Sequence, residues 1–430
     1  MSVLPDEPEA LVALLKEELS EGGVAGVMCD TVTRAQAAYR ALRDSFGGDA
    51  VMLTHARFMD LDRMENETVL RNLLGPDATR SNGRRPERMI VVGTQVLEQS
   101  LDIDFDLLVT DIAPIDLLMQ RLGRVHRHVR GGGEKDRPAR LRKARCFLRG
   151  IEEIGPEGPT FVPGVSRVYD KASLMEALAV SGLLGMETSV RFSLPKDIAR
   201  LVRLAYSPAA EGEIPEGWLS SYHDACEERA KTVQDKRLRA GDFLLPSAKY
   251  LSENEKTLTN LFCRAIEDSS NSKMSEDAGQ CAVRDTQETV EVLIVSRKDG
   301  CVYLLPWVRD EKSGVERGQE VPTAYEPDWA LSMVLAQCAV RLPLSLCRPQ
   351  QLDRLIEELE DGCERWVAAW QNVSVLAGRL VLAMEEAEAE PGVFEAEVLD
   401  QRVRYTREDG LSTVRREIQN FSISVKNSGK

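Results

Sequence analysis

The sequence predicts an α/β fold: a parallel sheet flanked by helices, then a mostly helical connector and a mixed α+β C-terminal domain. Two observations lead to this class. Up to about residue 130, short apolar runs typical of buried strands alternate with longer segments of helical spacing, and such alternation indicates parallel crossovers. Farther along, the signals become mainly helical and then mixed. We therefore place the domains at 1–150, 151–245 and 246–430.

The N-terminal domain is expected to alternate strands with helices from residue 24 onward. The strands are the apolar runs at 24–30, 50–58, 88–94 and 105–114. The predicted helices are 31–48, 60–76 and 115–127. A basic loop at 130–145 leads to a further strand in "CFLRG". In such sheets the loops at the carboxyl ends of the strands form the binding crevice.

The C-terminal domain is expected to combine a hairpin with helices. The runs "ETVEVLIVSR" and "CVYLLPWVR" flank Asp299-Gly300, a pair typical of a tight hairpin turn. Helical spacing predicts helices in "DRLIEELEDGCERWVAAWQ" and "LAGRLVLAMEEAEAE", with Trp366 and Trp370 on a core stripe. The polar stretch at 267–280 is interpreted as a surface loop.

Composition limits the classes to which the chain can belong. It has 430 residues, 43% of them hydrophobic, and no apolar run long enough to span a membrane. The first residues lack the cationic and apolar regions of a signal peptide. The nine cysteines show no CxxC spacing, which argues against a zinc ribbon or a disulfide framework. We therefore expect a cytoplasmic protein with no membrane partner and no metal ligands of its own.

The formal net charge of −15 is unevenly distributed. Residues 1–150 hold 22 Lys and Arg against 23 Asp and Glu, whereas the remaining residues hold 33 against 47. Within 121–149 there are eleven Lys and Arg but only two acids, Glu134 and Asp136. A local concentration of cations is the pattern expected where a polyanion is held.

The stretch "QRLGRVHRHVR" places Arg124 and Arg127 three residues apart, on one face of the predicted helix. Planar guanidinium groups suit a γ-phosphate because each can donate two charge-assisted hydrogen bonds. Gly123 would let the helix approach a neighbour closely, and Gln120 would orient an attacking water or sense the nucleotide. The alternative is a salt-bridged helix exposed to solvent. Arg121 and Arg130 are expected to support packing or the basic surface.

The combination of "TQVLEQSLD" with "QRLGRVHRH" resembles motifs V and VI of superfamily 2 helicases. More narrowly, it is similar to the helicase portion of the CRISPR-associated helicase-nuclease of type I systems. "GVMCDTVTRAQAAYRAL" resembles the motif IV region of that family, with Asp30 where asparagine is usual. The resemblance is strong over 24–128 and diffuse after about 200. It implies that 1–150 is a second RecA-like motor domain.

Two sets of residues receive roles from this resemblance. The nucleotide set comprises Asp102, Gln120, Gly123, Arg124 and Arg127. Within it, Arg124, Arg127 and Gln120 would be catalytic, and Asp102 would bridge to the arginines or the ribose. The DNA set, which would line a track for a single strand, comprises Thr31, Thr33, Arg57, Thr94, Gln95 and Gln99. Thr31 and Thr33 begin a helix, where free N–H groups favour a phosphate, although a plain N-cap explains either alone.

Three parts of the family pattern are not found in this sequence: the GxxxxGK[ST] phosphate loop, the acidic box that holds Mg²⁺, and the His-Asp nuclease ligands. The resemblance thus implies the C-terminal half of an ATP-dependent single-stranded DNA translocase, inactive alone as an ATPase. ATP would be shared with a polypeptide carrying the first RecA-like domain, the Mg²⁺ site and the HD-type nuclease. A CRISPR RNA-guided surveillance complex would be a further partner, in antiviral defence.

Two alternatives stay open at the level of sequence. The chain could be a non-catalytic DNA-binding or complex-docking module, or the remnant of a disrupted helicase gene, for which Asp30 is a small hint of drift. It could also be a different superfamily 2 helicase that acts on RNA, although "EQSLD" and "HRH" argue against that class.

Overall fold

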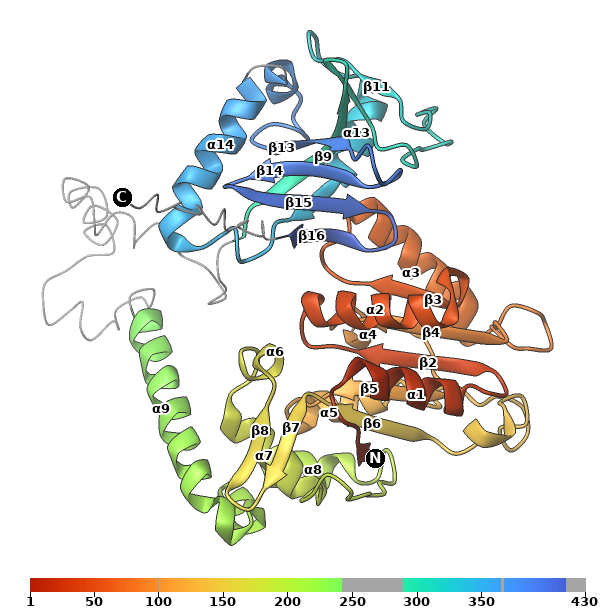
Figure 1. The fold of residues 1–430 in the computed structure, drawn as a ribbon, viewed down its shortest axis with the longest axis vertical. Coiled ribbons are helices and arrows are strands. Elements are labelled where there is room, and N and C mark those ends of the chain that lie inside the picture. Colours follow the sequence, from red (N-terminus) through yellow and green to blue (C-terminus); the bar gives the residue numbers. More distant parts are fainter. Residues whose placement is uncertain (100, 242–288, 365–366, 415–430) are drawn as a thin grey trace, which may run out of the picture.

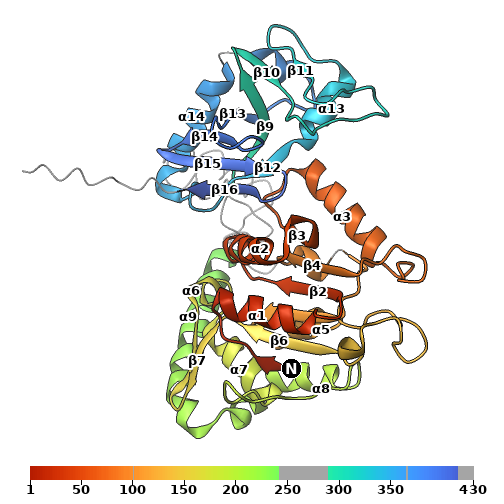
Figure 2. The same ribbon diagram turned by 45° about the vertical axis from the view of Figure 1, so that its right-hand side comes forward.

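The computed structural model describes residues 1–99, 101–241, 289–364 and 367–414. Over these ranges the chain forms an α/β domain, a connector below it and a C-terminal domain above it in the view of Figure 1, an arrangement that Figure 2 shows from a second side. The expected boundary at 245/246 and the expected loop at 267–280 lie outside the described residues. Within those residues, no helix combines the length and apolarity that a membrane span requires.

The N-terminal domain is built on a six-stranded sheet in which every neighbouring pair is parallel, in the order β1-β6-β5-β2-β4-β3. Its strands are β1 Ser2–Val3, β2 Gly23–Met28, β3 Val51–Thr54, β4 Arg88–Gly93, β5 Leu107–Asp111 and β6 Arg145–Arg149. Its helices are α1 Pro8–Glu18, α2 Val32–Phe46, α3 Asp60–Leu74, α4 Val96–Gln99 and α5 Ile115–Leu122. The predicted alternation of strands and helices and the parallel sheet are confirmed. The structure adds β1 and α1, which precede the first predicted strand.

The two faces of this sheet are covered by different helices. Ala25 and Val27 of β2 belong to the core formed with α1 and α2. Val24 and Met28 of the same strand belong to the core formed with α3 and α5. Successive side chains of a strand point to opposite faces, and a sheet covered on both faces needs apolar residues on both. This is why the strands read in sequence as continuous apolar runs.

Helix α5 is shorter than predicted, and the difference separates its arginines. The helix ends at Leu122 with Gly123 as its C-cap, and His126 has a φ of 51°. The chain therefore leaves the helical path before Arg127, so the expectation that Arg124 and Arg127 share a helix face is wrong. The expected close approach at Gly123 is also wrong. The atoms nearest to a Cβ built there belong to Gln120 and Met119 of the same helix.

The connector packs on the face of the sheet that α3 and α5 cover. It contains β7 Ile151–Gly155, β8 Gly158–Phe161, α6 Pro163–Ser166, α7 Lys171–Ser181, α8 Ile198–Ala205 and α9 Leu219–Gly241. The helical signals in "KASLMEALAVSGLLG" and "KDIARLVRLAY" are confirmed by α7 and α8. The antiparallel hairpin of β7 and β8 was not expected, because its sequence is rich in proline and glycine around the turn.

The C-terminal domain is a mixed sheet with the order β11-β10-β9-β13-β14-β15-β16, and β12 also pairs with β9. Its strands are β9 Glu291–Lys298, β10 Cys301–Tyr303, β11 Glu320–Val321, β12 Ala339–Arg341, β13 Leu380–Glu386, β14 Phe394–Val398, β15 Gln401–Thr406 and β16 Gly410–Val414. Its helices are α13 Trp329–Gln337 and α14 Leu352–Glu364. The mixed α+β class is confirmed.

Of two segments predicted in this domain, one is confirmed and the other is wrong. The hairpin of β9 and β10 turns at Asp299 and Gly300, which have φ values of 51° and 83°, as expected. The helix predicted in "LAGRLVLAMEEAEAE" is wrong, because that segment forms β13, which runs parallel to β9. Trp370 is buried in a separate 3₁₀ turn, Ala368–Asn372, and Trp366 lies outside the described residues.

The C-terminal domain meets the N-terminal domain at a buried seam, formed by Gln36, Met59, Asp62, Trp307, Tyr405 and Asp409. The Asp62 carboxylate accepts hydrogen bonds from the Tyr405 hydroxyl (2.6 Å) and from the Trp307 indole (3.1 Å). Met59 N–H donates to the Tyr405 oxygen, and Met59 packs in the core of the C-terminal domain. The seam therefore has the apolar packing and the paired polar groups of a domain interior.

Candidate nucleotide and nucleic-acid site

Arg121 lies at the centre of a buried polar cluster below the carboxyl edge of the sheet. The Arg121 cluster comprises Arg121, Asp30, Glu98, Thr110, Asp111 and Tyr169. Nε donates to Glu98, and Nη2 donates to Asp30 and to the Tyr169 hydroxyl, over 2.8–3.1 Å. Nη1 donates to the Thr110 hydroxyl and to the Asp111 carbonyl. All five N–H donors of this guanidinium are thus used, which confirms the expected packing role of Arg121.

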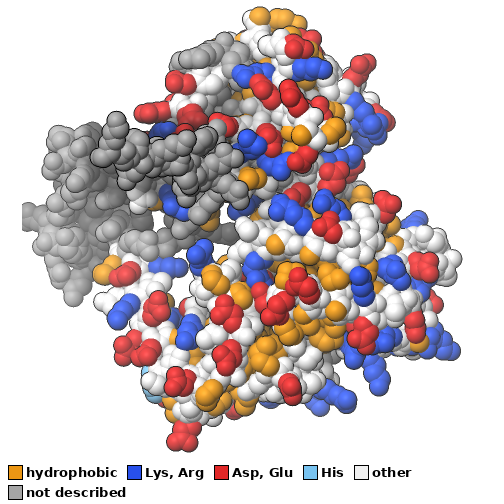
Figure 3. All heavy atoms as spheres, viewed as in Figure 1, with side chains coloured by type: hydrophobic (Ala, Val, Ile, Leu, Met, Phe, Trp, Pro, Cys, Tyr) orange, Lys and Arg blue, Asp and Glu red, His pale blue; other side chains and the backbone are white. Residues whose placement is uncertain are grey.

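Most of the cations counted in 121–149 do not form an exposed basic surface. Four are buried: Arg121, Arg130, Arg137 and Arg149. Arg130 and Arg137 both pair with the buried Asp104, and two exposed arginines pair with Glu17 and Glu18 of α1. Figure 3 shows Lys and Arg interspersed with Asp and Glu across one face of the molecule. The composition of 121–149 therefore overstated the footprint for a polyanion, because all the partner acids except Glu134 lie outside this range.

Arg124 and Arg127 differ from their buried neighbours. Arg124 is half-buried, and its Nη2 donates to the Glu98 carbonyl at 2.5 Å while its Nε is enclosed without a partner in the described part of the chain. Arg127 is exposed and pairs with Asp102. Burial lowers the pKa of Arg124, and the charge of Arg127 lowers it further. Two guanidinium groups that repel each other mark a place where an additional anion would be stabilised.

The other members of the nucleotide set lie around these two arginines. The Asp102 carboxylate accepts a hydrogen bond from Arg127, and this bond, outweighing partial desolvation, holds the pKa of that carboxyl below its usual range. Gln120 is exposed in the last turn of α5, and Gly123 caps that helix. The structure thus places Asp102, Gln120, Gly123, Arg124 and Arg127 in one region, and their contact with a nucleotide stays a prediction.

The DNA set lies mainly at the carboxyl edge of the sheet. Thr31 is the N-cap of α2, and its hydroxyl accepts from Arg34 N–H at 3.3 Å; Thr33 is exposed in the first turn of the same helix. Gln95 follows β4 and donates to the Asp30 carbonyl at 3.3 Å, whereas Thr94 is buried. Gln99 ends α4, and its side chain lies outside what the structure describes.

Arg57 stands apart from the rest of the DNA set, at the seam with the C-terminal domain. Its carbonyl accepts from Leu411 N–H at 2.8 Å. His55 beside it is fully buried and contacts the Asp409 carbonyl at 3.2 Å; burial lowers the pKa of His55 to about 3. His55 is therefore a neutral packing residue. The DNA role of Arg57 stays a prediction.

Two residues of the site received no role from the sequence, because the arginine that they hold lies 23 and 91 positions away along the chain. Glu98 holds Arg121 through its side chain and Arg124 through its carbonyl. Asp30 joins the loop before α2 to Arg121 across 91 positions of sequence. The position of Asp30 directly before Thr31, a predicted DNA contact, was a signal that could have led to it.

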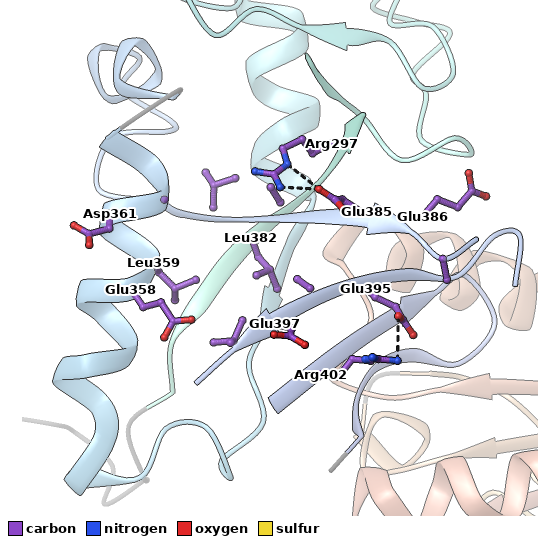
Figure 4. Close-up of a pocket in the computed structure, with 16 residues that line it drawn as sticks. Arg297, Glu358, Leu359, Asp361, Leu382, Glu385, Glu386, Glu395, Glu397 and Arg402 are labelled. Carbon is purple, nitrogen blue, oxygen red and sulfur yellow. Dashed lines mark hydrogen bonds and ion pairs between the residues drawn. The ribbon is translucent and has the colours of Figure 1, made fainter. Parts of the chain in front are cut away.

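The C-terminal domain contains a separate cavity of about 700 Å³ between α14 and strands β13 and β14 (Figure 4). Its lining includes six acids: Glu358, Asp361, Glu385, Glu386, Glu395 and Glu397. Only two cations, Arg297 and Arg402, line it as well. Because like charges repel, this cavity is unsuited to a nucleotide or to DNA.

The parallel sheet flanked by helices, with the half-buried Arg124 and the exposed Arg127 after α5, has the architecture of a RecA-like motor domain of a superfamily 2 helicase. Two protein-family models match the chain: "CRISPR-associated nuclease/helicase Cas3, C-terminal" over 21–130 and "Cas3 C-terminal domain" over 284–411. The chain belongs to the Cas3 family and corresponds to its C-terminal part.

Similar proteins agree with this membership. Cas3 of Streptococcus thermophilus is 31% identical over 385 residues, which are 89% of this chain and 38% of that protein. The crystal structure of T. fusca Cas3-ATP has a TM-score of 0.69, 23% identity, and coverage of 96% of this chain and 42% of that chain. A chain of a CRISPR RNA-guided surveillance complex, pre-nicking, has a TM-score of 0.65 at 23% identity and covers 96% and 44%. These structural likenesses show the fold, and the chain spans less than half of each relative.

Proposed function

We propose that this chain supplies the second motor half of an ATP-dependent single-stranded DNA translocase. In this proposal Arg124 and Arg127 stabilise the γ-phosphate of an ATP that is held by another RecA-like domain. Gln120 orients the attacking water, and Thr31, Thr33, Arg57, Thr94, Gln95 and Gln99 line the path of the DNA. Magnesium, the phosphate loop and the HD-type nuclease belong to that other part.

The observation that supports the nucleotide half best is the state of Arg124. Its enclosed Nε has no acceptor in the described structure, and an unsatisfied buried donor is costly unless a ligand completes it. Arg127 lies close enough to depress its pKa, so a phosphate there would be attracted by two cations. Such arginines are worth about 10³–10⁵ in rate in other phosphoryl-transfer enzymes.

The similar proteins also suggest which nucleotide and which complex this chain binds. T. fusca Cas3 has been crystallised with ATP, and another chain of similar fold belongs to an RNA-guided surveillance complex before nicking. By analogy we propose that ATP is the nucleotide and that an RNA-guided surveillance complex delivers the DNA, within a cytoplasmic antiviral defence system.

An ATPase assay on a reconstituted enzyme tests the proposal. The chain is mixed with a polypeptide that contains a GxxxxGK[ST] motor domain of the same family, with and without single-stranded DNA. We expect activity that depends on both polypeptides, and we expect Arg124→Ala to lower kcat by about 10³-fold with KM for ATP little changed.

The control for this assay is Arg142→Ala, which removes an exposed cation outside the nucleotide set and should leave kcat unchanged. Full activity of Arg124→Ala would show that Arg124 is not the finger. If no active mixture forms while the chain still binds DNA in a salt-sensitive way, the non-catalytic binding module is the correct alternative.

A further inference from the structure

The Arg121 cluster forms a continuous connection between the predicted DNA loop and the predicted arginine finger. Asp30 immediately precedes Thr31, and its carboxylate accepts from Arg121 at 2.9 Å. Arg121 in turn donates to Glu98 at 2.8 Å, and the carbonyl of Glu98 accepts from Arg124. Gln95, three residues before Glu98, donates to the Asp30 carbonyl. Every step of this connection is a direct hydrogen bond or a covalent connection within a short segment of the chain.

The charges around Asp30 are not balanced. The groups that face it are Arg121 of α5, Arg34 of α2, Asp111 at the end of β5, Glu98 of α4 and Tyr169 of the connector. Extending the network to Asp6 and Arg149 gives four carboxylates, Asp6, Asp30, Glu98 and Asp111, against three guanidinium groups. Asp30 Oδ2 and Glu98 Oε1 are buried without a hydrogen-bond partner in the described residues. Because unpaired buried oxygens are costly, an arrangement of this network that satisfied them would be favoured over the present one.

We propose that Arg121, held between Asp30 and Glu98, is a positioning residue that couples DNA contact at Thr31 and Gln95 to the placement of Arg124. This inference deepens the proposed function and rests on it. Arg121 itself touches neither nucleotide nor DNA. It acts through the two acids that it joins.

The coupling follows from the donor count of Arg121. All five of its N–H groups are engaged, so a shift of Asp30 cannot be absorbed by a spare donor. A phosphate drawn to the N-terminus of α2 would move the Asp30–Thr31 loop, and Arg121 would transmit that movement to Glu98. Because the Glu98 carbonyl holds Arg124, the finger would be repositioned when DNA is present.

The pH dependence of the coupling, set by the titration of Asp30, distinguishes this role of Arg121 from a purely structural one. Burial raises the pKa of Asp30 to about 7, with Arg121 opposing the shift and Asp111 adding to it. Protonation removes the charge that holds Arg121 to the DNA loop. The coupling should therefore be strong above about pH 8 and weak below about pH 6.

The test measures the stimulation ratio, which is kcat with saturating single-stranded DNA divided by kcat without it, in the reconstituted enzyme from about pH 6 to about pH 8. For the wild type we expect the ratio to rise with pH. For Asp30→Asn, which keeps an oxygen toward Arg121 but has no charge, we expect a ratio about tenfold lower at high pH and independent of pH. KM for ATP and the Kd for DNA should change by less than roughly twofold.

Asp106→Asn is the matched control. Asp106 is equally buried and accepts from Arg85 and Arg137, but it has no contact with the DNA loop or with Arg124. Burial opposes its ionisation, yet Arg85 and Arg137 outweigh burial and hold its pKa below the usual range. Asp106→Asn should lower the melting temperature and leave the stimulation ratio and its pH dependence as in the wild type.

The outcomes separate the inference from the proposed function. If the wild-type mixture is stimulated by DNA and both variants keep its ratio and pH profile, the coupling role of Arg121 is overturned. The coupling role is also overturned if Asp30→Asn changes only the Kd for DNA. If the wild-type mixture has no ATPase activity, the proposed function fails and the inference fails with it.

Discussion

Arg57 has a guanidinium group that is partly buried at the seam and makes no hydrogen bond or ion pair within the described ranges. Burial lowers the pKa of Arg57, so keeping its guanidinium group charged costs free energy. Three buried arginines elsewhere in the domain, Arg121, Arg130 and Arg137, pair with acids in contrast. An unpaired, accessible cation between two domains is suited to a phosphate of the DNA backbone.

Replacing this residue should change how DNA binding depends on salt. Loss of one phosphate contact on a single strand reduces the slope of log K against log salt by about 0.7. We therefore expect Arg57→Ala to weaken single-stranded DNA binding by the chain and to reduce this slope, as measured by fluorescence anisotropy over a salt series. Lys143→Ala, an exposed lysine away from the proposed track, should leave the slope unchanged. Identical slopes for the two variants would remove Arg57 from the DNA set.

The roles of individual arginines could be predicted only in part. Spacing in "QRLGRVHRHVR" identified a phosphate candidate at Arg124 and Arg127 and a packing role for Arg121 and Arg130. It could not show that Asp30 and Asp104 hold Arg121 and Arg130, because those acids lie 91 and 26 positions away in sequence. Burial and pairing between distant residues depend on the tertiary fold.

At the scale of elements, α3 connects the motor domain to the C-terminal sheet through Asp62. Its carboxylate accepts from Tyr405 and Trp307, whose rings are stacked with centroids 6.2 Å apart. Burial raises the pKa of Asp62 to about 6, against the opposing effect of these two hydrogen bonds. The seam therefore has a group that titrates above the usual range of an aspartate.

This group predicts a pH dependence of stability with a definite sign. An unfolded aspartate titrates near about 3.9, so the folded chain keeps its proton to a higher pH. The contribution of Asp62 is complete below about pH 4 and is lost as the pH rises through about 6, by roughly 3 kcal/mol in total. As the pH rises over this range, the free energy of unfolding of Asp62→Asn should therefore increase relative to that of the wild type, as measured by urea unfolding. Asp60→Asn, a more exposed residue of the same helix, should follow the wild type; parallel curves for all three proteins would contradict the assignment.

Elements were predictable where local pattern and tertiary pairing agree. The strands of the parallel sheet are buried on both faces, so their apolar runs could be recognised without a partner. β13 could not, because an apolar segment of that length fits a helix equally well and only its pairing with β9 decides. The early end of α5 was missed because its residues keep helical spacing after Gly123.

For the whole molecule, the two domains and the connector act as a scaffold that presents Arg124 and Arg127 at one side of the motor domain. The connector packs on the α5 face through a shared core, and the seam attaches the C-terminal domain through α2 and α3. In the proposed function, these two arginines bind the γ-phosphate of an ATP that another domain holds.

Complex formation with ADP and aluminium fluoride tests this role of the two arginines. Aluminium fluoride bound beside ADP resembles the γ-phosphoryl group during its transfer. The chain is mixed with the phosphate-loop domain and analysed by gel filtration with ADP alone or with ADP and aluminium fluoride. We predict a complex that forms only with aluminium fluoride and that is lost in Arg124→Ala and in Arg127→Ala, whereas Arg142→Ala retains it. Complexes of equal stability with wild type and both finger variants would contradict the proposed role of Arg124 and Arg127.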